Sequence, residues 1–184
     1  MFDSLKQRYQ DWQLKKLLRA SRDKTIKNWD VIHTVGLIFV VGSAEEWNLI
    51  SRFISAQKKQ GKQIFLIGFH PKDYAIDYIF THTETTICRE KEDLSFWGLP
   101  KADVINNFTE RHYDLLIDTT TENFFGKYIT ALSNADLKVG YYNPQFSTLY
   151  SQFTGYDLTI QGNDQFDLKK YLEQVVKYLS MIKK

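Results

Sequence analysis

The sequence predicts an α/β fold, in which a three-layer Rossmann-like or flavodoxin-like domain is built on a mainly parallel sheet of five or six strands. Three observations predict it. Short apolar runs of strand length alternate with amphipathic helical patterns, a helix-capping signal follows the first run, and a proline stops the second. The 184 residues suit one such domain, at residues 31–184, preceded by a basic helical extension at residues 1–30.

The clearest unit is a strand, a helix and a second strand. Val35–Val41 is a continuous apolar run, and Ser43 then precedes Glu46 at the spacing of a capping box, so a helix should begin there. Its apolar residues fall on one stripe, and Gly61 follows basic residues at its end. Gln63–Phe69 is the second strand, which ends before Pro71.

The rest of the chain continues the alternation. A third strand is expected within residues 84–91, although Tyr74–Phe80 also alternates like a strand. The following elements are then expected in order: a short helix after Pro100, a strand at Asp114–Asp118, a helix at Asn123–Asn134, a strand at Leu137–Tyr141, a strand at Asp157–Ile160, and a final helix capped by Asp164.

A ligand crevice is expected where the sheet changes direction. Right-handed connections give the strand order 3-2-1-4-5, which places the first and fourth strands side by side. The residues that would line the crevice at their carboxyl ends are Ser43, Asp118, Thr119, Thr120 and Thr121. They could hydrogen-bond a small polar or phosphorylated ligand.

A structural interpretation of the same residues is favoured. In it Thr121 or Asn123 caps the following helix, and Asp118 binds local backbone amides. The reason is the opposite lip, Gly42–Glu46, which has one glycine and two carboxylates where a phosphate cradle needs several glycines and no negative charge.

The first 28 residues are basic and helical in propensity. They carry eight Lys and Arg against three Asp, a net +5, whereas the whole chain carries +2. Their apolar residues lie on two faces, which predicts a helix that touches two surfaces. Candidate residues for binding a protein or an RNA-containing partner are Arg8, Tyr9, Trp12, Lys15, Lys16 and Arg19. The alternative, which is favoured, is that this helix packs on its own domain and its cations stay solvated.

Other chemistry finds little support. The four histidines are scattered, so we expect no catalytic residue, no metal site and no cofactor. Cys88 is the single cysteine, which excludes an internal disulfide, and it is expected to be buried. The aromatic loop at residues 95–101 is either a partner-binding patch or a buried plug, and burial is expected. No apolar run is long enough to span a membrane, so a cytoplasmic protein is expected.

Three segments resemble a known but uncharacterised family of conserved bacterial proteins. They are EEWNLISRFISAQKKQGKQIFLIGFHP, FWGLPKADVINNF and YDLLIDTTTENFFGKYITALSNADLKVGYY. The last is also similar to a strand, helix and strand of the N-terminal domain of lipopolysaccharide heptosyltransferases. Those enzymes build their nucleotide-sugar site with a second Rossmann-like domain, which we do not expect within these 184 residues, so no catalytic residue is carried over.

Two functions follow from the sequence. The first is a non-catalytic interaction protein that engages a protein or an RNA-containing assembly through its basic N-terminal helix. The second is a small-molecule or nucleotide-sugar binder, or a glycosyltransferase-like enzyme, with its ligand at the crevice of the sheet.

Overall fold

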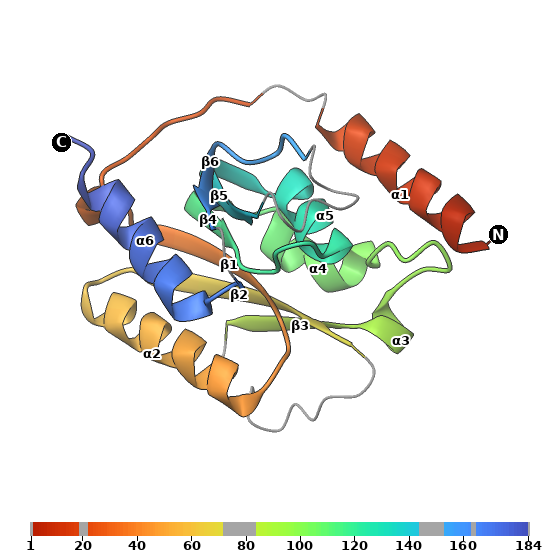
Figure 1. Cartoon of the computed structure of the whole chain (residues 1–184), viewed down its shortest axis with the longest axis horizontal. Helices are drawn as coiled ribbons and strands as arrows, with labels where there is room; N and C mark the ends of the chain where they lie inside the picture. The colour runs from red at the N-terminus through yellow and green to blue at the C-terminus, as the bar shows by residue number, and fades with distance from the viewer. Residues whose placement is uncertain (1, 19–21, 72–83, 144–152, 163–164, 184) are drawn as a thin grey trace.

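A computed structural model shows six parallel strands in one sheet, in the order β3-β2-β1-β4-β5-β6 (Figure 1). It describes residues 2–18, 22–71, 84–143, 153–162 and 165–183. The strands are β1 (Thr34–Val40), β2 (Gln63–His70), β3 (Thr85–Arg89), β4 (His112–Asp118), β5 (Asn134–Tyr142) and β6 (Leu158–Gln161). This is the Rossmann-like arrangement, and the predicted order of the first five strands is confirmed.

Helices cover both faces of this sheet and make three layers. One face carries α2 (Ala44–Lys59) and α6 (Leu168–Ser180), and the other carries α4 (Ala102–Thr109) and α5 (Phe124–Leu132) (Figure 1). The short helices η1 (Trp29–Val31) and α3 (Glu90–Asp93) complete the described domain. The N-terminal helix α1 (Phe2–Leu17) lies beside α5, outside the second layer (Figure 1).

Side chains of the central strands alternate between two hydrophobic cores. In β1, Leu37 points to the α2 and α6 side and Ile38 to the α4 and α5 side. Both are fully buried, as are Leu115 and Leu116 of β4, which point to the same two sides in turn. A strand that is buried on both faces reads as a continuous apolar run, which is the pattern that revealed these strands in the sequence.

The predicted caps are largely confirmed. Ser43 and Glu46 form the capping box of α2, and Asn123 caps α5 by accepting a hydrogen bond from the Phe125 amide. Gly61 follows α2 with a φ of +80°, a conformation that favours glycine. The cap of α6 is a correction: Asp167 accepts from the Lys170 amide, three residues beyond the predicted cap, Asp164, which lies outside the described residues.

The N-terminal extension is helical only in its first part. Helix α1 ends at Leu17, and residues 22–28 are irregular and run across the domain to η1 (Figure 1). Arg22 and Thr25 bond the start of β5, and Lys27 bonds Asp114 of β4, so the irregular segment runs along the amino ends of these strands. The competing strand pattern at Tyr74–Phe80 lies outside the described residues. In the part of the chain that the structure describes, no helix has the length and apolarity needed to cross a membrane.

Candidate functional sites

Helix α1 docks on its own domain through one narrow face. Leu14 is buried, and Gln10 is buried and donates a hydrogen bond from Nε2 to the Trp97 carbonyl at 3.0 Å. Tyr9 packs on the Trp97 ring, with 4.9 Å between ring centroids. The helix is therefore held both by apolar burial and by a buried amide whose hydrogen bond would be costly to lose.

The outward face of α1 carries most of the predicted partner-binding residues. Arg8, Lys15 and Lys16 are exposed, and 54% of Trp12 is exposed. The Lys16 ammonium lies 5.7 Å from the centre of the Trp12 ring. Tyr9 is half-buried against Trp97, and Arg19 lies outside the described residues. The structure thus brings cations and an accessible aromatic ring together on one side of one helix.

The aromatic loop extends this surface, contrary to the expected burial. Phe96 is 72% exposed and Trp97 is 37% exposed, and the two rings meet edge to face at 5.4 Å. Gly98 forces this outcome, because its φ of +73° makes a tight turn that the Ser95 carbonyl closes by accepting from the Gly98 amide. A Cβ at Gly98 would lie 2.6 Å from Cε of Lys6, so α1 sits directly against the turn.

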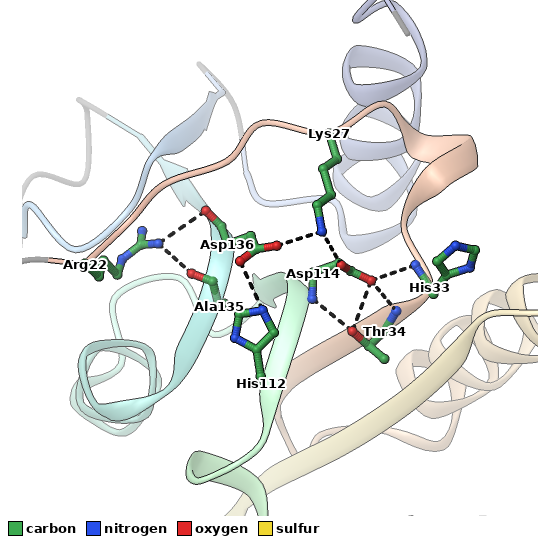
Figure 2. A network of polar contacts seen from close by, with 8 residues as sticks. All are labelled: Arg22, Lys27, His33, Thr34, His112, Asp114, Ala135 and Asp136. Carbon is green, nitrogen blue, oxygen red and sulfur yellow. Dashed lines mark hydrogen bonds and ion pairs between the residues drawn. The ribbon is translucent and has the colours of Figure 1, made fainter.

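The cations of the irregular segment do not belong to this surface. Lys27 donates to Asp114 at 2.5 Å and pairs with Asp136 at 2.7 Å, as Figure 2 shows. Arg22 bonds the carbonyls of Ala135 and Asp136 and pairs with the Asp157 carboxylate, with which Lys24 also pairs (Figure 2 shows the contacts to the carbonyls). Three of the eight N-terminal cations are therefore neutralised by the domain itself.

These cations pair with carboxylates at the amino ends of the strands. Asp114 also accepts hydrogen bonds from the His33 and Thr34 amides, which ties β4 to the start of β1 (Figure 2). Burial alone would raise the pKa of Asp114, but the hydrogen bonds from Lys27, Thr34 and His33 outweigh it and hold that pKa well below its ordinary value. The hydrogen bonds that Lys27 donates to Asp114 and Asp136 raise the pKa of Lys27. The segment therefore has a structural role at the edge opposite to the predicted crevice.

At the carboxyl edge, the predicted ligand-binding residues are mostly occupied by internal contacts. Asp118 is buried, and one carboxylate oxygen accepts from both the amide and the hydroxyl of Thr120, at 2.8 and 2.7 Å. The Thr119 hydroxyl donates to the Ile38 carbonyl at 2.9 Å. Ser43 is exposed and its hydroxyl accepts from the Glu46 amide in the cap of α2. These contacts favour the structural interpretation of the edge.

A buried lysine completes this network and was not predicted from the sequence. Lys127 is 2% exposed and donates from Nζ to the Tyr156 hydroxyl at 2.6 Å and to the Thr121 carbonyl. The Tyr156 hydroxyl in turn donates to Asp118 at 2.5 Å. Burial lowers the pKa of Lys127, which the nearby Asp118 partly offsets, and burial beside Asp118 raises the pKa of Tyr156.

The buried lysine also holds an unusual backbone conformation. Thr121 has a φ of +54°, which is strained for a β-branched residue, and its carbonyl receives the Lys127 ammonium. In the sequence, the one signal of a buried cation was a lysine between Phe125 and Ile129, which are both buried on α5. A cation inside an apolar stripe indicates a buried partner, but the sequence cannot show that the partners are Tyr156 and Asp118.

A small cavity lies at the same edge. It has a volume of about 270 Å³ and is lined by Gly42, Glu46 and Thr119–Thr121, with apolar side chains from β1, α2 and the start of α6. Neither Ser43 nor Asp118 lines it. Thr121 is the one lining threonine whose hydroxyl makes no hydrogen bond within the described residues. The cavity therefore has little free polar chemistry, and Glu46 disfavours anions.

Cys88 and the metal-ligating side chains that the structure describes form no further candidate site. Cys88 is fully buried, as expected, and burial raises the pKa of its thiol to about 12. Over the described ranges, no three His, Cys, Asp or Glu side chains gather at a geometry that holds a metal ion.

Comparison with known proteins places the chain in a family. Residues 6–182 match the Family of unknown function (DUF6913), so the chain belongs to this family. A comparison with curated proteins finds no match. One solved structure with some likeness is the catalytic domain of starch synthase IV from Arabidopsis thaliana bound to ADP and acarbose, at 15% identity and a TM-score of 0.36. That match covers 97% of this chain and 39% of the other, and a likeness this weak supports no functional argument.

Proposed function

We propose that this protein is a non-catalytic binding protein, acting in a cytoplasmic setting, that engages a protein or an RNA-containing assembly through the outward face of α1. The observation that carries the proposal is the exposed group of Arg8, Trp12, Lys15 and Lys16 on a helix that is already anchored by its other face. We call these four residues the α1 surface.

The chemistry of the α1 surface and its neighbouring loop fits a nucleic acid strand better than a purely apolar partner. Cations bind the phosphate backbone, and exposed aromatic rings such as Trp12 and Phe96 stack on bases. The helix is pre-organised, because Gln10 and Leu14 fix it on the domain before any partner arrives. An RNA-containing partner is therefore the first expectation.

The test is affinity purification of the tagged full-length chain, with and without RNase. The variant Arg8→Glu/Trp12→Ser/Lys16→Glu should lose the partner, because it reverses two charges and removes the ring on exposed positions only. A matched control, Lys59→Glu/Lys91→Glu, reverses two exposed charges on other elements and should retain it. Retention of every partner by the α1 variant would contradict the proposal.

Deleting the first 28 residues would be a poor version of this test. It would also remove Lys27 from Asp114 and the Asn28 side chain, which donates to the Ile182 carbonyl at 2.5 Å. A lost partner would then report an unfolded domain instead of a lost surface.

The cavity at the carboxyl edge supports a second candidate function, the binding of a nucleotide or nucleotide sugar, with glycosyltransferase-like chemistry as its extreme form. Its support is the position of the cavity between β1 and β4, where such sheets bind ligands. A thermal-shift panel of nucleotides and nucleotide sugars tests it, and Thr121→Val should reduce any shift by removing the free hydroxyl. A panel without a stabilising ligand would count against it.

A further inference from the structure

A second hollow lies on the α2 and α6 side of the sheet, between these two helices, which run beside each other in Figure 1. Its volume of about 520 Å³ is within the range of small-molecule sites. Leu49 and Phe53 from α2, with Leu172 and Val176 from α6, make its surface mainly apolar. We call it the α2–α6 groove.

One polar group in the groove lacks a partner. Gln57 lines the groove and is only 7% exposed, and its amide oxygen is buried without a hydrogen-bond partner among the described residues. Buried acceptors are nearly always satisfied in folded proteins. The oxygen is covered in this conformation, so a rotation of the Gln57 amide would bring it to the groove surface, where a ligand N–H or O–H would satisfy it.

The rim of the groove is cationic. Arg52 on α2 and Lys177 on α6 line opposite walls, are exposed, and form no ion pair within the described part of the chain. Glu173 is the one carboxylate of the lining, and it pairs with Lys169 one turn away at 3.9 Å. An anionic group held at the mouth would therefore meet two uncompensated cations.

We propose that the α2–α6 groove binds a small amphipathic anion with an apolar ring or chain, one hydrogen-bond donor and one negative charge. The apolar part covers Leu49, Phe53 and Val176, the donor reaches Gln57, and the anion contacts both Arg52 and Lys177. The backbone amides of a partner helix are bonded within that helix and would leave the Gln57 oxygen unsatisfied, so a small molecule with its own donor fits the groove better.

Two dyes with the same rings and the same N–H test this proposal on the full-length chain. Anilinonaphthalene sulfonate carries a negative charge, and phenylnaphthylamine is its neutral counterpart. Fluorescence titration should give one site per chain for the anion, with affinity about tenfold higher than for the neutral dye, as one charge-assisted contact provides. Equal affinities, or no saturable site, would overturn the proposal.

Three variants assign the contacts. Arg52→Gln and Lys177→Gln should each weaken the anion several-fold and leave the neutral dye unchanged, whereas Gln57→Leu should weaken both dyes. Lys91→Gln, at an exposed position of α3 outside both proposed sites, is the matched control and should change neither. Unchanged binding of the anion in both cation variants would overturn the proposal, as would a dimer in sedimentation velocity that Val176→Glu disrupts, because a second copy would then occupy the groove. None of these outcomes depends on the α1 surface, so this test is independent of the test of the proposed function.

Discussion

Replacing Lys127 by methionine should destabilise the fold strongly. Lys127 is 2% exposed, and its ammonium donates hydrogen bonds to the Tyr156 hydroxyl and to the Thr121 carbonyl and lies 3.8 Å from Asp118. Breaking a buried charge pair on one side costs about 3–5 kcal/mol. Asp118 keeps three donors from Thr120 and Tyr156, so the lower end of this range applies, about 3 kcal/mol.

This loss is measurable by urea denaturation and by heating. For a chain of this size each kcal/mol shifts Tm by about 2–4 °C, so Lys127→Met should lower Tm by roughly 6–12 °C. Lys15→Met, on an exposed position of α1, is the control and should stay within about 0.5 kcal/mol of the wild type.

A double-mutant cycle identifies the cause. If the penalty comes from the uncompensated Asp118 charge, Lys127→Met/Asp118→Asn should recover at least about 1 kcal/mol relative to the sum of the single changes. A cost below about 1 kcal/mol for Lys127→Met, or strictly additive effects, would refute the reasoning.

Three further predictions follow from the described contacts. Asp114→Asn should cost about 2 kcal/mol at neutral pH, because the Lys27 pair is lost. The folded-state pKa of Asp114 is depressed, so the wild type keeps this stability above about pH 4 and loses it as the pH falls through the folded value. The free energy of unfolding of the variant, measured by urea denaturation, should therefore fall less steeply as the pH is lowered into the acid range. Thr121→Asn should raise stability by about 1 kcal/mol in thermal unfolding, because asparagine tolerates a φ of +54° better than threonine. Gly98→Ala should cost more than Gly61→Ala and should increase hydrogen exchange of α1, because only Gly98 packs against that helix.

Each of these has its own contrary result. If the free energy of unfolding of Asp114→Asn falls with pH in the acid range as steeply as that of the wild type, the Lys27 pair does not set the pH dependence. A loss of stability in Thr121→Asn would show that the backbone there is not strained in solution. Equal costs at Gly98 and Gly61, which have similar φ values and differ in their neighbours, would show that α1 does not rest on the turn.

The fold was predictable because its signals are local. A strand buried on both faces leaves an apolar run such as that of β1, and Ser43 with Glu46 marks a helix start within four residues. The handedness of parallel connections then fixed the order of β1 to β5 without any knowledge of contacts.

The sites were harder to predict because they depend on distant partners. The sequence shows Asp118 and Lys127 nine residues apart, but it cannot show that Tyr156 lies between them. Counting charges in the sequence could not show their partners either. Lys27 and Lys15 count equally in the sequence, yet Asp114 and Asp136 neutralise only Lys27. Phe96 is exposed because of the turn at Gly98. The expectation that aromatic residues are usually buried took no account of this turn.

The α1 surface is tested most directly by site-specific photocrosslinking in the native cell. A photoreactive amino acid at position 12 lies on the α1 surface, and one at position 55 is exposed on α2, on the other face of the sheet. The α1 surface predicts a discrete crosslinked partner from position 12 that is absent from position 55, and an RNA partner if the product is sensitive to RNase. The same product from both positions, or from position 55 alone, would contradict it.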